Sequence, residues 1–492
     1  MISREEEMLA GRIIPTVQEL RLNSEKLYHL VDCAVLEVAS PVASEICQTI
    51  IDECSRRFWN IKLNITCAPL PQSMSDESYK ITISQEKIQI EAADENAIRH
   101  AMNTLRQLAE TERGVAKFSC YILPAVTISD APRLAFRGLH ICQIPETPVW
   151  ELEKEIRLAA YYKFNYVVME FWGTLRFKSH PELCWSEYGI EQSQVKALLK
   201  VAQSLGVTLI PQINLFGHAS FSRCGSGKHA LLDFHPEYAS LFEPDGWSWC
   251  LSNPATRQYL TDLVLEIHEL FDSPKYFHIG CDEAYNAASC TLCRRGNLAE
   301  LLKSHLLYFH ELLAKRGARL MMWHDMLLNV EDKKYHGYIV CGHEANHLDK
   351  LYQELPKDII ICDWQYGYPK KDDQEPTWPT SKFFKNNGFE VLVCPWIEPS
   401  GTLSLGKFAA ENQLKGMLCT SWNINHSHYM FRIFYCGANG AWNPFYTEYP
   451  ALVYREFFNR HLREIHHDMG ITKYIQTGSV QYQINPTDYQ QG

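Results

Sequence analysis

Two neighbouring carboxylates, Asp282 and Glu283, have the clearest capacity for chemistry in this sequence. They close the run His278-x-Gly280-x-Asp282-Glu283, which continues an apolar and aromatic stretch that begins at Tyr276. Successive residues of an extended chain point to opposite sides, so two adjacent acids at a strand end can take different positions around one ligand. Burial and mutual repulsion are expected to push the acidities of the two groups apart. The pair can therefore supply one proton donor and one lasting anion.

A carboxylate pair of unequal acidity suits glycoside hydrolysis. One carboxyl keeps its proton and gives it to the leaving oxygen, while the other stays ionised and stabilises a cationic transition state. An Asp-Glu dipeptide alone is common on solvated loops. This interpretation therefore depends on the element that carries the pair and on the residues around it.

The elements that must position the pair are short β-rich runs that alternate with amphipathic helical stretches. Eight such runs lie at residues 134–141, 166–171, 207–214, 276–280, 319–323, 359–364, 391–394 and 417–422. Eight β/α units in roughly 300 residues are what a (β/α)₈ TIM-type barrel requires, and the regular alternation favours parallel strands. We therefore expect an α/β protein whose chemistry lies at the carboxyl ends of the barrel strands.

Polar and aromatic residues gather near the ends of these runs. They are Arg137 on the first run, Gln212, Asn214 and His218 at the third, His278 with the acid pair on the fourth, Trp323 and Asp325 at the fifth, Asp363, Trp364 and Tyr366 at the sixth, Trp396 and Glu398 at the seventh, and Trp422 and Asn423 at the eighth. Indole rings beside charged and amide groups predict a pocket that stacks a sugar ring and binds its hydroxyls.

The residues before the barrel predict a small α/β domain. Alternating runs at 79–84 and 87–92 indicate a hairpin, and a helical pattern follows from Asn96 to Glu110. Polar and Pro-containing sequence at 127–133 indicates a boundary. We expect domains at residues 1–130 and 131–450, followed by a C-terminal helix and tail at 451–492, with helical pattern over 454–462.

Composition narrows the class of protein. The net charge of −11, without a basic stripe, argues against a nucleic-acid partner, which needs phosphate neutralisation. No apolar run has the length of a membrane span or of a secretory leader, so we expect a cytoplasmic protein.

Most of the 17 cysteines are expected to be buried thiols. Cys290 and Cys293 form one C-x-x-C without a second pair at zinc-ribbon spacing; two loop thiols are favoured, and a metal or redox role stays open.

The chain resembles the β-N-acetylhexosaminidases of glycoside hydrolase family 20. His278-x-Gly280-x-Asp282-Glu283 on the expected fourth strand resembles the family signature, and Phe136-Arg137-Gly138 matches its Arg-Gly. Residues 210–218, Ile-Pro-Gln-Ile-Asn-Leu-Phe-Gly-His, are similar to the family's Pro-Glu-Ile-Asp-x-x-Gly-His run. The three tryptophans of the fifth, sixth and eighth strands fall where the family places its pocket walls. The N-terminal hairpin and helix look like the small domain that precedes the family's barrel, so the resemblance covers most of residues 60–440.

The resemblance implies an exo-acting enzyme that removes terminal β-linked GlcNAc or GalNAc. In the retaining, substrate-assisted mechanism of that family the substrate's own acetamido oxygen attacks the anomeric carbon. By carry-over, Asp282 orients the acetamido group, and Glu283 protonates the leaving oxygen and later activates water. Arg137 would bind ring hydroxyls, and His218 and His278 would hold the carboxylates.

The resemblance also assigns the aromatic residues, and it implies no cofactor. Trp323, Trp364 and Trp422 would enclose the acetamido methyl and stack on the sugar, and Asp325 is a candidate hydroxyl binder. Because proton transfer and the acetamido group supply the chemistry, no metal or organic cofactor is expected. The expected partner is a glycan or oligosaccharide with a terminal N-acetylhexosamine. A homodimer stays open, since barrels of this kind often lend loops to a neighbour's pocket.

The chain also departs from the family pattern. Gln212 and Asn214 stand where the family has Glu and Asp, and Cys281 stands for the second Gly of the signature. The eighth strand is followed by Asn423 and Ile424 instead of a hydroxyl-binding Glu, for which Glu398 is a candidate replacement. The tyrosine that binds the acetamido oxygen in the family has no evident counterpart, and Tyr366 is a candidate.

Other interpretations stay open at this point. One is a glycosidase of the same fold that acts on a different or modified amino sugar, or releases a disaccharide. A second is a catalytically inactive carbohydrate-binding protein, against which the retention of Glu283 speaks. For Arg137 the alternative is a structural ion pair, and for His218 and His278 it is a buried histidine with satisfied hydrogen bonds.

Overall fold

The computed structural model describes most of the chain in two compact units. The described residues are 3–30, 33–55, 62–111, 121–145, 147–184, 187, 189–220, 228–366, 376–422, 430–445, 451–470, 473–476 and 480–483. One unit contains the described residues up to Arg133, residues 157–164 and the described residues from Ala441 onward. The other contains residues from Leu134 to Ile156 and from Asn165 to Gly440 and carries the candidate site.

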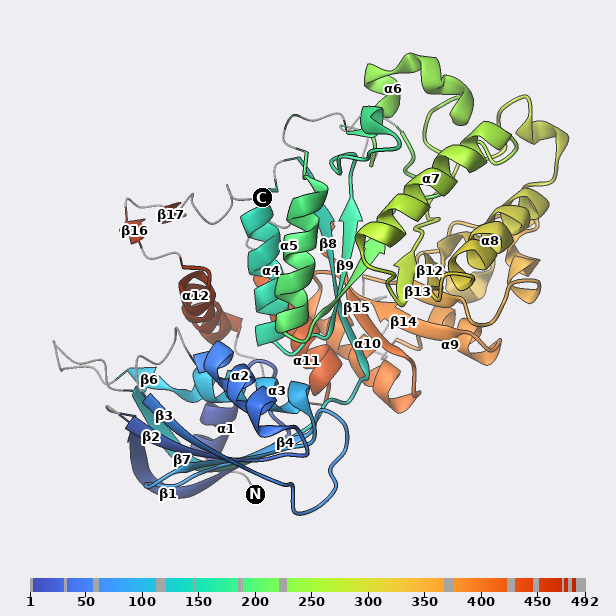
Figure 1. Ribbon diagram of the computed structural model, residues 1–492. Coiled ribbons are helices and arrows are strands. Elements are labelled where there is room, and N and C mark those ends of the chain that lie inside the picture. Colours follow the sequence, from blue (N-terminus) through green and yellow to red (C-terminus); the bar gives the residue numbers. More distant parts are fainter. Residues whose placement is uncertain are drawn as a thin grey trace. The chain divides into compact units, whose positions relative to one another are not determined.

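The second unit is a closed barrel of eight parallel strands, which confirms the predicted fold. Its strands are β8 (Phe136–Gln143), β9 (Tyr166–Phe171), β10 (Thr208–Gln212), β11 (Tyr276–His278), β12 (Arg319–Trp323), β13 (Ile360–Trp364), β14 (Glu390–Cys394) and β15 (Gly416–Cys419). The ring closes where β15 pairs with β8, with Leu418 beside Gly138. Figure 1 shows these strands at the centre of the unit, with helices such as α5, α7 and α8 around them.

Helices follow the strands along the chain, as the alternating pattern requires. They are α4 (Val149–Tyr161), α5 (Gln192–Ser204), α6 (Leu231–Phe234), α7 (Pro254–Leu270), α8 (Leu298–Ala314), α9 (Pro379–Asn386), α10 (Pro399–Glu411) and α11 (Met430–Trp442). Local sequence sets their starts. Helix α8 begins where the side chain of Asn297 accepts hydrogen bonds from two backbone N–H groups, and α7 begins with Pro254 after the cap Asn253.

The inside of the barrel is filled by side chains from alternate positions of the strands. Phe136 stacks on Tyr166 with ring centroids 4.1 Å apart, and Tyr276 meets both rings edge-on. Toward the carboxyl ends this core continues into Trp323 and Trp364. The barrel is therefore a packed core that ends in an aromatic layer at the rim where the acid pair lies.

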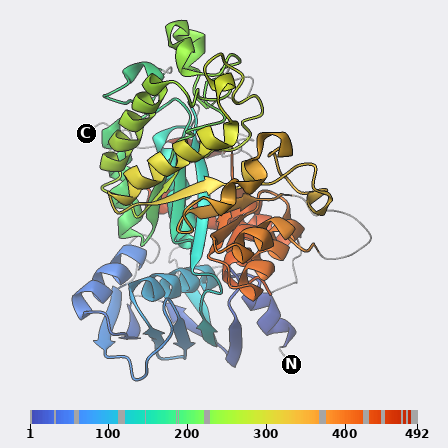
Figure 2. The ribbon, with the colours of Figure 1, turned by 90° about the vertical axis from the view of Figure 1, so that its right-hand side faces the viewer.

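The first unit is built on a mixed sheet with the strand order β1-β7-β4-β5-β2-β3, and β6 pairs with β7. The strands are β1 (Glu19–Leu30), β2 (Cys33–Ala39), β3 (Lys62–Ala68), β4 (Tyr79–Ile83), β5 (Ile88–Ala92), β6 (Glu110–Thr111) and β7 (Tyr121–Asp130), and the helices are α1 (Arg4–Ala10), α2 (Ser44–Ser55) and α3 (Glu95–Leu108). The antiparallel pair β4 and β5 with α3 confirms the predicted hairpin and helix. Figure 2 shows α2 and α3 side by side along this sheet.

The C-terminal residues group with this first unit. Helix α12 (Ala451–Asp468) places Asp468 beside Arg106, with Nη2 and Oδ2 2.8 Å apart, and β16 (Lys473–Gln476) pairs with β17 (Val480–Gln483). The fully buried ammonium of Lys163 pairs with Asp130 at 2.9 Å. Within the described residues, no helix combines the length and apolar composition that crossing a membrane requires.

Candidate active site

The acid pair lies on a backbone turn directly after β11. Gly280, Cys281 and Glu283 all have positive φ values, of 66°, 74° and 48°. Such values cost free energy for residues other than glycine and persist where the surrounding structure enforces them, often at functional sites. Gly280 is required as glycine, because a Cβ there would lie 1.9 Å from the side-chain oxygen of Asn214. The loop after β10 thus packs tightly under the turn that presents the pair.

His218 bridges the two carboxylates. Its Nε2 lies 3.2 Å from Oδ2 of Asp282 and 3.1 Å from Oε2 of Glu283, and its side chain is 8% exposed. Burial would lower the pKa of His218, but the charge of Asp282 and hydrogen bonds to both acids raise it to about 9. The imidazole therefore carries a proton at neutral pH and holds the pair together as a cation.

Glu283 is held as an anion in the free site, which corrects the expectation of a raised pKa for the proton donor. Burial would raise the pKa of Glu283, but hydrogen bonds from His218 and Tyr285 outweigh it and lower the pKa below its ordinary value. The Tyr285 hydroxyl donates to Oε1 at 2.6 Å. The imidazolium and the hydroxyl both favour the charged form and outweigh the burial that would raise the pKa of Glu283.

Asp282 presents a free acceptor. It is 3% exposed, and its Oδ1 is buried without a hydrogen-bond partner among the described residues, whereas Oδ2 faces His218. A buried carboxylate oxygen without a donor is costly, so a site of this kind suits a ligand that brings an N–H or O–H group. Burial and the nearby charge of Asp282 hold the pKa of Tyr366 well above its usual range, which places that phenol in the same site.

Asp325 supports the pair from below and is corrected from a hydroxyl binder to a positioning residue. It is fully buried, and both carboxylate oxygens accept hydrogen bonds from the protein. The backbone N–H of Glu283 donates to Oδ2 at 2.9 Å, and Nε1 of Trp364 donates to Oδ1 at 3.1 Å. Burial and the charge of Asp282 raise the pKa of Asp325 to about 6. Because Asp325 is 0% exposed, neither oxygen is accessible to a sugar.

The three predicted tryptophans form one aromatic layer with a tyrosine. Ring centroids lie 5.5 Å apart between Trp323 and Trp422, 5.2 Å apart between Trp364 and Tyr366, and 6.4 Å apart between Tyr366 and Trp422. Trp396 joins this layer at 5.3 Å from Tyr366. Trp323 is fully buried and Trp422 is partly exposed, so Trp323 forms the floor and Trp422 an accessible face.

His278 lies behind this layer and is neutral. Its ring is 4.3 Å from that of Trp323, and its Nδ1 accepts the backbone N–H of Gly280 at 3.1 Å. Burial, followed by the nearby His140, holds the pKa of His278 well below its ordinary value. The residue positions Trp323 and the turn before the acid pair.

The structure does not bring Arg137 to the site. Arg137 is the second residue of β8, at the amino-terminal end of the strand, and the acid pair follows the carboxyl end of β11. Its Nη1 donates to the carbonyls of Leu134 at 2.9 Å and Ala135 at 3.4 Å. The strand direction explains the correction: the first residues of parallel barrel strands lie at the rim opposite the loops that carry chemistry.

A buried lysine and glutamate, which the sequence argument missed, lie beside the aromatic layer. Lys228 is 4% exposed, and its Nζ is 3.3 Å from Oε1 of Glu170, 4.0 Å from the ring centre of Trp172 and 5.0 Å from that of Trp422. Oε2 of Glu170 also contacts Nε2 of His140, at 3.1 Å. The sequence could have indicated Glu170 as a site residue, since it is an acid inside the apolar run of the second strand. A single lysine in a loop, such as Lys228, gives no such indication.

The residues that differ from the family pattern lie in different environments. The side-chain amide of Gln212 donates to Oδ1 of Asn214 at 3.5 Å, and both residues are buried. Glu398 is exposed at the start of α10, where it accepts a hydrogen bond from Ser400 at 3.1 Å. Asn423 and Ile424 lie outside the described residues.

Two groups near the site have side-chain types that bind metals, but contacts within the protein already use their charges. In the group of Asp282, Glu283 and His218, Nε2 of the histidine contacts both carboxylates. In the group of His140, Cys142 and Glu170, the ammonium of Lys228 pairs with the carboxylate.

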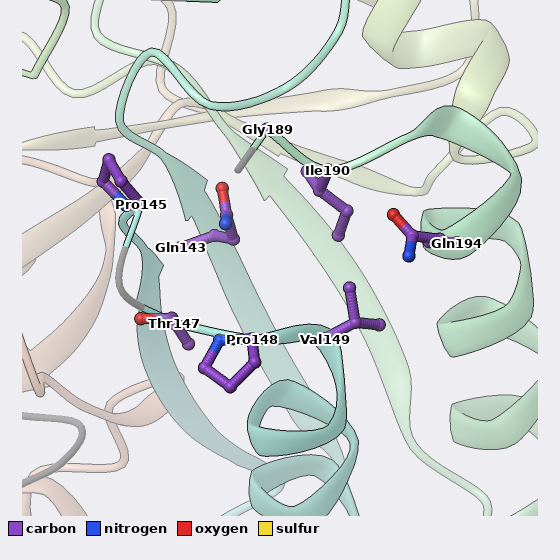
Figure 3. A pocket seen from close by; sticks show the side chains of 8 residues that line it. All are labelled: Gln143, Pro145, Thr147, Pro148, Val149, Gly189, Ile190 and Gln194. Carbon is purple, nitrogen blue, oxygen red and sulfur yellow. The ribbon is translucent and has the colours of Figure 1, made fainter. Parts of the chain in front are cut away.

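A separate cavity of about 500 Å³ opens beside the end of β8 (Figure 3). It is lined by Gln143, Pro145, Thr147, Pro148, Val149, Gly189, Ile190 and Gln194. Neither the acid pair nor the aromatic layer lines it. We therefore place the candidate site at the acid pair and not in this cavity.

Comparison with family models identifies the family. The model described as glycosyl hydrolase family 20, catalytic domain, matches residues 170–422, and the model described as domain 2 of this family matches residues 10–131. The chain belongs to glycoside hydrolase family 20. This family-20 chain is 24% identical over 339 residues to a beta-hexosaminidase of Vibrio furnissii, across 59% of this chain and 49% of that protein. It is also 26% identical over 222 residues to a lacto-N-biosidase of Bifidobacterium bifidum, across 43% of this chain and 18% of that protein.

Solved structures support the fold of this family-20 chain. An exo-beta-N-acetylglucosaminidase of Vibrio harveyi gives a TM-score of 0.69 at 17% identity and covers 93% of this chain and 77% of that one. An N-acetyl-beta-hexosaminidase of Streptomyces plicatus gives 0.66 at 16% identity and covers 95% and 97%. The chain spans half or less of the length of the two curated relatives named above.

Proposed function

We propose that this family-20 chain is an exo-acting, retaining β-N-acetylhexosaminidase that removes terminal β-linked GlcNAc or GalNAc. One observation carries the proposal: Asp282 keeps a buried, unpartnered oxygen while His218 joins it to Glu283. Membership in family 20 and the named hexosaminidase relatives agree with this activity.

Asp282 acts on the acetamido group. Its Oδ1 accepts the amide N–H, which orients the acetamido oxygen toward the anomeric carbon and stabilises the positive charge that develops on the ring formed. Tyr366 donates its hydroxyl to the acetamido oxygen, because its raised pKa keeps the phenol protonated. In this mechanism no side chain forms a bond to the sugar.

Glu283 transfers the proton. A bound sugar excludes water from the carboxylate, which raises its pKa, and the imidazolium of His218 at 3.1 Å is a proton source. The protonated acid then donates to the leaving oxygen, and the carboxylate later takes a proton from the attacking water. The pair and His218 thus share the proton that the reaction needs.

Trp422 and Lys228 bind the sugar itself. Trp422 offers the accessible ring face for stacking, and Trp323 and Trp364 close the pocket around the acetamido methyl. We assign to Lys228 and Glu170 the hydroxyl contacts expected of Arg137, since the ammonium of Lys228 lies 5.0 Å from the ring centre of Trp422 and pairs with Glu170.

The test is hydrolysis, by the wild type and by Glu283→Gln, of the β-N-acetylglucosaminide and the β-N-acetylgalactosaminide of a simple alcohol, whose leaving oxygen must be protonated. The proposal expects both substrates to be cleaved and the variant to lose about 10²–10⁴-fold in kcat. A folded wild type that binds these sugars without cleaving them would favour a carbohydrate-binding protein.

A second candidate, release of a disaccharide, is favoured by the similarity to a lacto-N-biosidase. It retains the same acid pair but requires room for two sugar rings beyond Trp422. Aryl glycosides of a monosaccharide and of a matching N-acetylhexosamine-containing disaccharide discriminate the two candidates, since only one of them should be a good substrate.

A further inference from the structure

A second group of ligating side chains lies away from the acid pair. It consists of Glu243, Cys250, Cys290 and Cys293, whose nearest ligand atoms all lie within 4.8 Å of one another. Glu243, Cys250 and Cys293 are 2%, 1% and 1% exposed, and Cys290 is partly buried. The C-x-x-C of the sequence therefore does acquire two further donors, from a segment some 40 residues earlier.

The sulfur separations match a shared metal ion better than a disulfide. Sγ of Cys250 lies 3.6 Å from Sγ of Cys290 and 3.6 Å from Sγ of Cys293. A disulfide holds two sulfurs about 2.05 Å apart and leaves a third thiol over. Four ligands around zinc, with Zn–S bonds of about 2.3 Å, place neighbouring sulfurs about 3.8 Å apart. Two separations of 3.6 Å from the sulfur of Cys250, with all ligand atoms within 4.8 Å of one another, fit the second arrangement.

The remaining contacts hold the donors in place. The backbone N–H of Cys293 donates to Sγ of Cys290 at 3.3 Å. Oε2 of Glu243 accepts the backbone N–H of Cys290 at 2.6 Å and the hydroxyl of Ser289 at 3.2 Å. Its Oε1 is buried without a hydrogen-bond partner among the described residues. A carboxylate that is fixed through one oxygen while the other stays free and buried is arranged as a metal ligand.

We propose that Glu243, Cys250, Cys290 and Cys293 bind one structural Zn²⁺ in a closed, four-coordinate site. Three thiolates and one carboxylate are a donor set that zinc accepts in tetrahedral geometry. Four protein ligands leave no open position, so this ion takes no part in hydrolysis.

The proposed ion joins two segments that meet at the active site. Glu243 and Cys250 stand on either side of a hairpin closed by the bridge between Phe242 and Trp249, and Trp247 at its turn donates Nε1 to the backbone carbonyl of Glu283 at 2.6 Å. Cys290 and Cys293 lie in the loop that follows Glu283. Binding zinc therefore fixes the contact between Trp247 and the backbone of the catalytic residue.

The first test measures the metal content of the full chain, purified without chelator, by inductively coupled plasma mass spectrometry. The proposal expects about one zinc per chain in the wild type and less than about 0.1 in Cys290→Ser and Cys293→Ser. Cys67→Ser is the matched control, because Cys67 is a partly buried thiol on β3 in the other unit, and it should keep the full content. A wild type without stoichiometric zinc, or variants that keep it, would overturn the proposal.

A second measurement does not depend on whether the variants fold. Wild-type protein stripped of metal and titrated with Co²⁺ alone should give the intense visible bands of tetrahedral cobalt and thiolate-to-cobalt charge transfer at one equivalent, and Zn²⁺ should abolish them. Absence of these bands, or peptide mapping that finds a disulfide between Cys250 and either cysteine of the pair, would overturn the site.

Discussion

Replacing His218 by Asn removes a buried cation that contacts both catalytic carboxylates. Its Nε2 lies 3.2 Å from Asp282 and 3.1 Å from Glu283, and the variant removes the cation that lies between the two anions. Removing one partner of a buried ion pair typically costs about 3–5 kcal/mol. The pair can reduce this cost by taking up a proton, so the size of the effect must depend on pH.

The magnitude follows from the pKa of His218. A rise from the ordinary value of 6.5 to about 9 corresponds to about 3 kcal/mol of stability. Neutralising a carboxyl of ordinary pKa 4.5 costs the variant about 3 kcal/mol at about pH 7 but less than 1 kcal/mol at about pH 5. The stability that follows from the pKa shift of His218 and the cost of protonating a carboxyl in the variant are therefore both about 3 kcal/mol near neutral pH.

The sign of the pH dependence follows from the two shifts. Because the pKa of His218 is raised, its contribution is complete below about 6.5 and is lost as the pH rises through about 9. Because the pKa of Glu283 is lowered, its contribution is present above about 4.5 and is lost as the pH falls through the folded value. The stability gap between wild type and variant should therefore be widest at about pH 6–7 and narrow on both sides.

The assay is calorimetry of the barrel transition at several pH values. About 3 kcal/mol corresponds to a Tm difference of roughly 5–10 °C for a unit of this size. His180→Asn is the matched control, since His180 also lies between two carboxylates, at 3.2 Å from Glu182 and 3.3 Å from Asp262, but is 19% exposed. Its effect should stay within about 1 kcal/mol. A His218→Asn effect no larger than that of the control, or one that grows steadily with pH, would refute the reasoning.

Three further substitutions test other contacts of the site. Tyr285→Phe removes a donor to Glu283 that is more than half exposed, so the pKa of Glu283 should rise toward its ordinary value, seen as an upward shift of the limb of the kcat/KM profile that reports deprotonation of the acid. Asp325→Asn keeps only one acceptor oxygen for the N–H of Glu283 and the indole of Trp364, which should cost about 2 kcal/mol in thermal unfolding and lower kcat with little change in KM. Arg137→Lys should lower Tm through its lost carbonyl contacts, while KM stays within about twofold; a large rise in KM would return Arg137 to the sugar site.

Much of the barrel could be predicted, because alternation of apolar strands with helices is a local property of the sequence. The second and fifth strands, Tyr166–Phe171 and Arg319–Trp323, begin and end where the apolar runs do. The acid pair and the three tryptophans could also be placed, since Trp323 and Trp364 end their strands and the other residues follow a strand end. The prediction for Arg137 was wrong because it ignored the position of the residue along its strand. Arg137 is the second residue of β8, and a side chain there cannot reach the loops at the opposite rim.

Contacts between distant segments could not be predicted from one sequence. Lys228 reaches Glu170 across 58 residues, and the fold alone brings Cys250 to Cys290 across 40. The charge state of Glu283 depends on His218, 65 residues earlier, and on the rotamer of Tyr285, neither of which a spacing encodes. The sequence pattern predicts which residues lie at strand ends. The protonation of these residues depends on tertiary contacts, which the pattern does not predict.

The most direct test of the central claim compares leaving groups in Glu283→Gln. If Glu283 gives its proton to the leaving oxygen, kcat/KM should fall by about 10²–10⁴-fold for an N-acetylglucosamine disaccharide and stay near the wild-type value for a dinitrophenyl glycoside, whose leaving group needs no proton. Asp282→Asn, which acts on the acetamido group, should impair both substrates alike. An equal loss on both substrates in Glu283→Gln would contradict its role as the general acid.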